Sequence, residues 1–267
     1  MLRFGEQLLD VGYIDTLATG DSVLHRLDPR SKVIVTLAFI VAVLSFDKYA
    51  LSGLVPFFIF PVVLISRSGL PAGYLLKKVV LVAPFAVLVA AFNPLIDRQV
   101  LMHIGPLAVS GGWLSFCSIF LRFFLTVSAA LVLISLTGFN AVCLALSKFG
   151  VPRPFVVQLL FFFRYLFVLG DQTHRMLLAR QMRSFDRRPM PWNVFVSLTG
   201  HLLLRTLDRS ERIYLAMCSR GFDGNIRIVR RIRIGRNDVV FILGWVSLFV
   251  LLRIYNIPLM LGNLIGG

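Results

Sequence analysis

Acidic residues are scarce in this sequence, and charged residues of either sign are few. Only 13 of the 267 residues are Asp or Glu, and charged residues make up 15% of the chain. Soluble domains average about a quarter charged and about half apolar residues, whereas this chain is 57% hydrophobic with a mean hydropathy of +0.82. These proportions exclude an ordinary soluble domain. The net charge of +15 therefore indicates orientation in a membrane, and we expect no binding to nucleic acid.

The sequence also lacks the patterns that chemistry at a site would need. Its three cysteines and four histidines are scattered, without the spacing of a disulfide framework or a metal site. They are Cys117, Cys143, Cys218, His25, His103, His174 and His201. There is no phosphate-binding loop of the Walker A type, so the chain is not expected to hydrolyse ATP. We predict no catalytic residue, no metal site and no cofactor in this chain.

Long apolar runs, in contrast, are abundant and predict an all-α, polytopic membrane protein. A spanning helix needs about 20 apolar residues, and each predicted span approaches that length. The spans are residues 32–46, 51–66, 79–95, 114–136 and 239–252. A last apolar stretch, 257–265, is too short to cross alone. We therefore predict about five to six transmembrane helices.

Basic residues near the ends of the spans predict the orientation, because cytoplasmic loops carry an excess of Lys and Arg. The residues concerned are Arg26, Arg30, Lys32, Arg67, Lys77 and Lys78. Residues 1–31 are predicted to be cytoplasmic, since acids precede any apolar run, unlike in a cleavable signal. Residues 32–137 then hold the first four spans of a multi-pass protein of the plasma membrane. A hydrophilic block, 138–237, follows in the cytoplasm, and residues 238–267 return to the membrane.

Two features of the membrane part leave alternatives open. Asp28-Pro29 predicts the start of a helix, and the basic residues beside it serve either as orientation signals or as a docking surface. Arg122 is the one charge inside the fourth span. It either faces an internal or partner contact or extends to the outer edge of the membrane.

The hydrophilic block concentrates the basic charge. Residues 139–237 hold 17 of the 28 basic residues, 16 of them Arg, against five acidic ones, which gives a net charge of +12. Arg in such excess favours bidentate contacts at interfaces, and part of it is expected to serve lipid headgroups. The pattern predicts two long amphipathic helices, about 155–185 and 191–221, joined by a rigid turn that contains proline.

The two predicted helices end in the same short pattern, Ala-x-x-x-Arg-[Ser/Gly]-Phe-Asp. The first copy runs from Ala179 to Asp186 and the second from Ala216 to Asp223, an offset of 37 residues. Ala and Arg four residues apart lie on one face of a helix. The small residue lets another surface come close, and Arg offers a planar set of donors. The repeat predicts one docking device that is built twice and presented to a partner.

These residues resemble the transmembrane T component of energy-coupling factor transporters, the CbiQ/EcfT family. The resemblance covers nearly the whole chain and rests on four stretches. They are His25-Arg26-Leu27-Asp28-Pro29-Arg30-x-Lys32, Gly150-Val151-Pro152, Phe163-Arg164-Tyr165-Leu166 leading to Ala179-Arg180-x-x-Arg183, and Gly200-His201-Leu202-x-x-Arg205-x-x-x-Arg209-x-x-Arg212 leading to Ala216-Met217-x-x-Arg220-Gly221-Phe222-x-Gly224. Ser184 departs from the family, which usually has Gly at that position.

The resemblance implies a non-catalytic coupling subunit of an ATP-driven importer. Two ABC-type ATPase subunits would bind ATP and magnesium, and a membrane-embedded S component would bind the substrate. The implied ATPase-docking residues are Ala179, Arg180, Arg183, Ser184, Ala216, Arg220 and Gly221. The implied supporting residues are Arg164, Arg205, Arg209 and Arg212.

The region before His25 is most similar to T components of the cobalt or nickel type, which implies those ions as substrates. T components for vitamins share the motifs, so a biotin or shared-module importer is the alternative. From another class, a membrane enzyme acting on a phosphorylated lipid would use the arginines to hold phosphate. Such an enzyme would also need Asp-rich or His-bearing motifs at a membrane face, and the sequence has none.

Overall fold

The computed structural model describes residues 12–47, 51–93, 100–104, 107–183, 191–222 and 235–254. Its elements in chain order are α2 (Pro29–Leu44), the 3-10 helix η1 (Ser52–Phe58), α3 (Ile59–Ser68), α4 (Ala72–Ala90), β1 (Val100–Ile104), β2 (Leu107–Ser110), α6 (Gly111–Thr137), α7 (Phe139–Lys148), α8 (Arg153–Arg183), α9 (Trp192–Cys218) and α10 (Arg236–Ile254). The chain divides into two compact units. One unit comprises residues 1–13 and 143–231, and the other residues 14–142 and 232–267.

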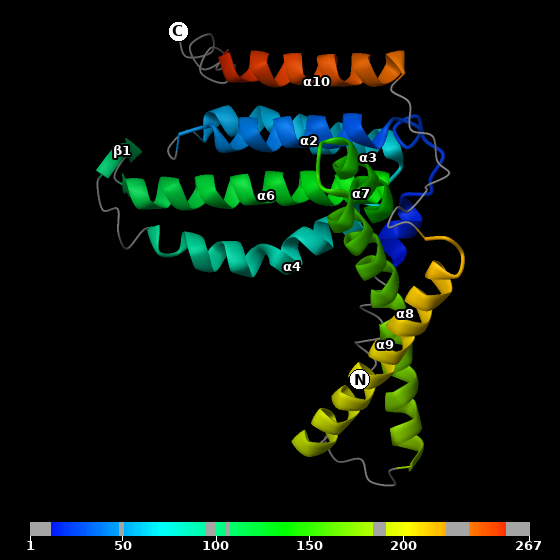
Figure 1. Ribbon diagram of the computed structural model, residues 1–267. Coiled ribbons are helices and arrows are strands. Elements are labelled where there is room, and N and C mark those ends of the chain that lie inside the picture. The colour runs from blue at the N-terminus through cyan, green and yellow to red at the C-terminus, as the bar shows by residue number, and fades with distance from the viewer. Residues whose placement is uncertain are drawn as a thin grey trace. The chain divides into compact units, whose positions relative to one another are not determined.

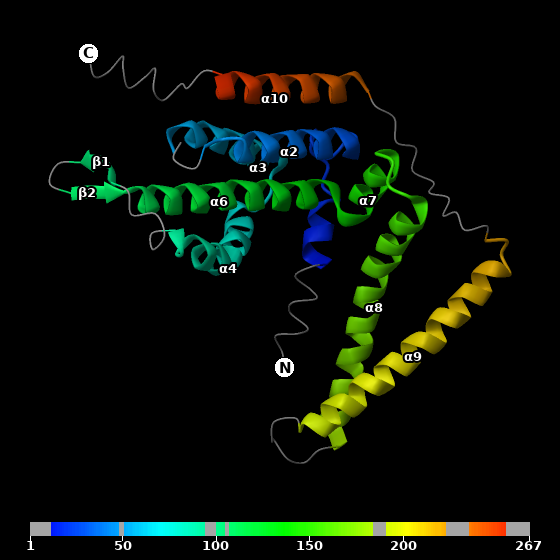
Figure 2. The ribbon, with the colours of Figure 1, turned by 60° about the vertical axis from the view of Figure 1, so that its left-hand side comes forward.

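The unit of residues 14–142 and 232–267 is a stack of apolar helices (Figures 1 and 2). In it, α6 packs against α2, α3 and α4, and α2 packs in turn against α10. Three of its helices, α4, α6 and α10, are long and apolar enough to cross a membrane. A helix covers most of each predicted span: α2, α4, α6 and α10 cover the first, third, fourth and last, and η1 with α3 covers the second. The predicted all-helical, multi-pass membrane fold is confirmed.

Phenylalanine side chains from several helices form the core of this unit. Phe39 of α2 is fully buried. Its ring stacks on Phe60 of α3, with 4.5 Å between centroids, and meets Phe249 of α10 edge-on at 5.4 Å. Buried small residues of α6, among them Ser118 and Ala129, let neighbouring helices approach closely, as is usual between membrane helices.

Apolar side chains also cover the outer surface of these helices. On α4, Leu81 is 71% exposed and Phe85 is 69% exposed. In water, a large contiguous apolar surface of this kind is a liability. In a bilayer it is required, because lipid-facing positions must be apolar while the helix satisfies its own backbone. The surface therefore agrees with the hydropathy in placing this unit in lipid.

The start of α2 follows its local sequence. Asp28 is the residue before the helix, and its Oδ1 accepts a hydrogen bond from the backbone N–H of Arg30 at 2.9 Å. Pro29 occupies the first helical position, where its missing N–H carries no cost. The predicted helix start at Asp28-Pro29 is confirmed.

The other end of α2 is held by two arginines from other helices. With 16 residues, α2 is about 24 Å long, shorter than the roughly 30 Å of a hydrocarbon core. Just beyond it, Arg122 of α6 donates to the carbonyl oxygen of Asp47 at 2.5 Å, and Arg253 of α10 donates to that of Ser45 at 2.8 Å. Of the two alternatives for Arg122, the structure shows the contact with protein.

A short β hairpin precedes α6, and the sequence analysis did not predict it. β1 pairs with β2 in antiparallel register, with Ile104 opposite Leu107. The hairpin is the one departure of the described residues from an all-helical chain. It falls between two long apolar runs, in a stretch where hydropathy alone indicates a loop.

Candidate functional site

Two long helices carry the candidate site residues. α8 has 31 residues and α9 has 27, and both lie in the unit of residues 1–13 and 143–231. A proline lies at the start of each helix: Pro154 is the second residue of α8, where proline suits the first turn, and Pro191 directly precedes α9. The helices run in opposite directions and cross each other (Figures 1 and 2). Both predicted helices are confirmed, with bounds shifted by a few residues.

The described part of the first copy, residues 179–183, lies in the last turns of α8 and lines a cleft against α9. Ala179, Arg180 and Arg183 all line this cleft. Ala179 and Arg183 are exposed, whereas Arg180 is half-buried. Both arginines belong to the last turn of α8, where positive charge offsets the helix dipole. Ser184 lies outside the described residues, so its docking role stays a prediction.

The second copy ends α9 with a glycine in the left-handed conformation. Gly221 has a φ of +77°. The N–H of Phe222 donates to the carbonyl of Met217 at 3.1 Å, and the N–H of Gly221 donates to that of Cys218 at 3.0 Å. This pairing is a Schellman cap, which favours Gly at the left-handed position. The space beside Gly221 is open, so the backbone conformation explains the glycine here, and close approach by a partner stays a prediction.

The two arginine-bearing ends lie far apart on the helix pair. Because the helices are antiparallel, Arg183 at the end of α8 lines the cleft together with Asn193 at the start of α9. Near the other end, Met217 of α9 lines a second cavity together with Gln158 of α8. A rise of 1.5 Å per residue places about 38 Å between residues 158 and 183 of α8. Ala216 and Arg220 are exposed at that far end, so two separate partners can reach the two ends at once.

The cleft between α8 and α9 has a volume of about 1230 Å³ and is lined by five arginines. They are Arg175, Arg180 and Arg183 of α8 and Arg205 and Arg209 of α9. Arg175 pairs with Asp171, one turn earlier on α8, at 2.9 Å. In the part of the chain that the structure describes, the other four make no ion pair, and Asp171 is the one acid in the lining. Guanidinium groups gathered in this way favour an anionic group.

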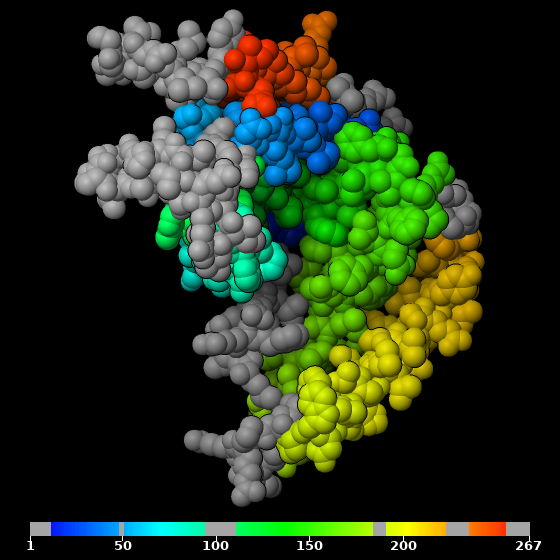
Figure 3. Space-filling view, turned by 90° about the vertical axis from the view of Figure 1, so that its left-hand side faces the viewer, coloured from blue at the N-terminus to red at the C-terminus, as the bar shows by residue number. Residues whose placement is uncertain are grey.

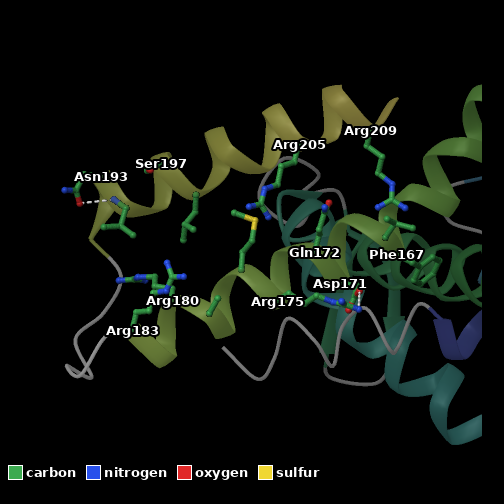
Figure 4. Close-up of a pocket in the computed structure, with 15 residues that line it drawn as sticks. Phe167, Asp171, Gln172, Arg175, Arg180, Arg183, Asn193, Ser197, Arg205 and Arg209 are labelled. Atoms are coloured by element: carbon green, nitrogen blue, oxygen red, sulfur yellow. Dashed lines mark hydrogen bonds and ion pairs between the residues drawn. The ribbon is translucent and has the colours of Figure 1, made fainter. Parts of the chain in front are cut away.

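The four supporting arginines fall into two pairs. Arg205 and Arg209 extend from α9 toward α8 and line the cleft (Figure 4). Arg164 and Arg212 are exposed and are not among the lining residues. Arg212 instead donates from Nε to the carbonyl of Asp208 in its own helix, at 3.3 Å. The family resemblance grouped all four as supporting residues, whereas in the structure only Arg205 and Arg209 line the cleft.

Comparison with known families gives a match over most of the chain. Residues 20–229 match the family described as cobalt transport protein, CbiQ. The chain belongs to the CbiQ family. The family predicted from the motifs is thereby confirmed.

Several curated proteins are similar to this CbiQ-family chain over most of their length. An uncharacterized protein of Methanocaldococcus jannaschii is 29% identical over 245 residues, which cover 88% of this chain and 83% of that protein. The energy-coupling factor transporter transmembrane protein EcfT of Listeria innocua is 26% identical over 221 residues, 77% of this chain and 82% of that protein. EcfT of Bacillus subtilis is 25% identical over 235 residues, which cover 81% of this chain and 87% of that protein.

In this CbiQ-family chain, one lysine of the basic N-terminal motif is buried and forms hydrogen bonds within its own unit. Lys32 is only 6% exposed. Its ammonium donates to the carbonyl oxygen of His25 at 3.2 Å and to that of Leu136, near the end of α6, at 3.1 Å. The docking alternative is therefore wrong for Lys32, whose charge is used inside the unit.

His25 anchors the turn before α2. Its Nδ1 lies 2.6 Å from Ser22 Oγ, and its Nε2 lies 3.1 Å from the carbonyl oxygen of Leu17. The ring packs so closely on Gly20 that an added methyl carbon would come within 2.9 Å of His25 Cε1. Burial lowers the pKa of His25 below its ordinary value of 6.5, and the nearby ammonium of Lys32 lowers it further.

Asp238 joins this cluster, although sequence reasoning did not single it out. It is 5% exposed and accepts hydrogen bonds from the backbone N–H of Asp28 at 2.7 Å and from Ser31 Oγ at 3.1 Å. The only sequence signal was an acid at the first turn of a predicted span. Among the described residues, no three His, Cys, Asp or Glu side chains come together to hold a metal ion.

Proposed function

We propose that this chain is the energy-coupling transmembrane component of an ATP-driven importer, with each arginine-bearing helix end docking one ATPase subunit. The observation that carries this proposal is the separation of Arg183 and Arg220 at opposite ends of the crossed pair α8 and α9. The ends of α8 and α9 carry the same motif but are too far apart to contact one small surface. This arrangement suits two copies of one partner. The relatives named as energy-coupling factor transporter transmembrane proteins support the same role.

The docking surface in this proposal is small and basic. Arg183 and Arg220 supply the charged contacts, which an acidic groove would receive in a bidentate manner. The neighbouring docking residues are Ala179, Arg180, Ser184, Ala216 and Gly221. ATP and magnesium are assigned to the ATPase subunits, and the chain itself is assigned no cofactor and no catalytic residue.

Coupling follows from the stiffness of the two helices. Closure of the ATPase pair would change the distance between the two docked ends, and α8 and α9, placed on the cytoplasmic side, would carry that change to the membrane helices. A membrane-embedded S component held by those helices would then reorient with its substrate. We propose cobalt or nickel ions as the substrate, and the description of the family as cobalt transport protein supports cobalt. A vitamin is the alternative, because the relatives named EcfT are not described as cobalt transporters.

The test is co-purification of the ATPase pair with charge-reversed variants of the full chain. Arg183→Glu or Arg220→Glu alone should halve the amount of ATPase retained, and the double variant should lose both ATPase subunits and metal-ion uptake. His174→Glu with His201→Glu is the matched control, because both histidines are exposed on the same two helices and belong to none of the docking or supporting positions. Full retention of ATPase by the Arg183 and Arg220 double variant would overturn the proposal.

A further inference from the structure

A second cavity, of about 500 Å³, lies between α8 and α9 beside the arginine cleft. Its lining is mainly apolar and aromatic: Phe161, Tyr165 and Leu169 from α8, and Leu207, Ile213, Tyr214 and Met217 from α9. Arg209 lines both cavities, so the apolar cavity and the arginine cleft meet at this residue. We call the two together the α8–α9 groove.

The groove is ordered along α8. Residues 158–169 line its apolar part, and residues 167–183 line its basic part. α8 is also one of the four described helices that are long and apolar enough to enter a membrane, and its last turn is basic. One groove thus passes from an apolar section to a cationic section in the direction of the chain.

α9 leaves much of its apolar surface without a protein neighbour. None of its residues is buried. Leu203, Leu204 and Leu207 are each more than half exposed. Figure 3 shows α9, in yellow to orange, as an exposed ridge of its unit. Apolar surface of this extent beside a cationic cleft marks a binding surface rather than ordinary solvated helix.

We propose that the α8–α9 groove binds one anionic phospholipid. The phosphate lies between Arg205 and Arg209, and an acyl chain lies in the apolar cavity beyond Arg209. Charge complementarity selects the occupant: the cleft presents five guanidinium groups and one carboxylate, and that carboxylate is already paired with Arg175. Guanidinium recognises phosphate in a bidentate manner. In a phospholipid the charged headgroup is followed by an apolar acyl chain, and in the groove the arginine cleft is followed by the apolar cavity.

This inference does not rest on the proposed function. Arg180 and Arg183 stay at the far end of the cleft for ATPase docking, whereas Arg205 and Arg209 adjoin the apolar cavity. A lipid at this position would hold α8 and α9 at their crossing. It would also cover apolar surface that the protein leaves open.

The experiment titrates the detergent-solubilised full chain with a fluorescent phosphatidylglycerol, and separately with the corresponding phosphatidylcholine. We expect saturable binding of phosphatidylglycerol and at least tenfold weaker binding of phosphatidylcholine. Arg205→Gln and Arg209→Gln should each weaken phosphatidylglycerol binding about fivefold, and together about 25-fold. Arg164→Gln with Arg212→Gln is the matched control and should leave the binding constant unchanged.

A second pair of variants tests the acyl chain. Ile213→Asn places a polar group in the apolar cavity and should weaken binding, whereas Leu204→Asn, exposed on α9 outside both cavities, should not.

Inorganic phosphate that displaces the lipid at equal concentration would show a plain anion site and overturn the proposal. Equal binding of phosphatidylcholine, or an unaffected double arginine variant, would do the same. The titration contains no ATPase, so its outcome is independent of the proposed coupling role.

Discussion

The carboxylate of Asp238, in the first turn of α10, accepts a hydrogen bond at 2.7 Å from the backbone N–H of Asp28, which lies 210 residues earlier in the chain. The same side chain accepts from Ser31 Oγ at 3.1 Å and from the N–H of Gly235 at 2.8 Å. One buried carboxylate thereby joins the start of the last membrane helix to the start of α2. It lies near the N-terminal ends of both helices, where negative charge is favourable.

Asp238→Ala should destabilise the membrane unit. The substitution removes the acceptor of two backbone N–H groups, those of Asp28 and Gly235, whereas the hydroxyl of Ser31 keeps the carbonyl oxygen of Asp28 as its acceptor at 2.6 Å. Each such loss costs about 1–3 kcal/mol where the donor is buried. We expect the free energy of unfolding to fall by about 2 kcal/mol or more, seen as a lower thermal unfolding midpoint of the full chain in detergent. The unfolding midpoint of Asp238→Asn should lie between those of the wild type and Asp238→Ala, because the amide of Asn keeps one acceptor oxygen.

Ser247→Ala is the matched control on the same helix, because the hydroxyl of Ser247 is exposed and donates only to the carbonyl of Gly244 in the next turn back. We expect its midpoint to equal that of the wild type. Equal midpoints for Asp238→Ala and Ser247→Ala would show that the carboxylate does not fasten α10.

Stability should fall on acidification because of His25. Burial, with the ammonium of Lys32, holds the pKa of His25 below its ordinary value of 6.5. The unfolded chain therefore takes up the proton at a higher pH than the folded chain does. The contribution of neutral His25 is fully present above about pH 6.5 and is lost as the pH falls through the folded pKa.

The measurement for His25 is the unfolding midpoint between about pH 7 and about pH 5. His25→Gln should flatten the decline, because the residue that titrates is gone. His201→Gln, at an exposed position of α9, should keep the wild-type slope. A slope in His25→Gln as steep as that of the wild type would assign the acid sensitivity to other groups.

Local signals were sufficient to predict the start of α2 and the end of α9. Asp28 caps α2 with Pro29 at its first position, and Gly221 follows α9, because capping depends on neighbouring residues alone. The role of Asp238 was not predictable in this way, since its partner lies 210 residues away and hydropathy reads it as one more charge at a membrane edge. The arginine repeat was visible in the sequence, whereas the sorting of Arg205 from Arg212 depends on which face of α9 turns toward α8.

Gly221→Ala should loosen the end of α9. The left-handed conformation costs a residue with a Cβ roughly 1–2 kcal/mol, so the cap that holds Arg220 should open more often. Amide hydrogen exchange in the last turn of α9 should speed up about 5- to 30-fold. Gly221→Asn should exchange at a rate closer to the wild type, because Asn tolerates this conformation.

The control for Gly221 is Gly200→Ala in the interior of α9. An added carbon there meets nothing within 4 Å, and Ala is the better helix former by about 1 kcal/mol. Exchange in the last turn should therefore not increase. Equal exchange in Gly221→Ala and the wild type would show that the cap does not depend on the glycine.

Arg122 and Arg253 should act together on the end of α2. Arg122 donates to the carbonyl of Asp47, and Arg253 donates to that of Ser45 while its guanidinium lies 4.3 Å from the ring centroid of Phe46. Arg122→Met and Arg253→Met each remove one exposed hydrogen bond, at a cost of about 0.5–1.5 kcal/mol. The double variant should lose less free energy of unfolding than the two single variants lose together. The reason is that the first substitution already releases the helix end that the second arginine holds. Residues that hold the same short backbone segment show coupling of about 0.5–3 kcal/mol, which the unfolding midpoints of the wild type, the two single variants and the double variant would measure. The control is Arg236→Met, at an exposed position at the start of α10, which should leave the unfolding midpoint unchanged. Strictly additive losses of free energy in the double variant would show that the two guanidinium groups stabilise α2 independently.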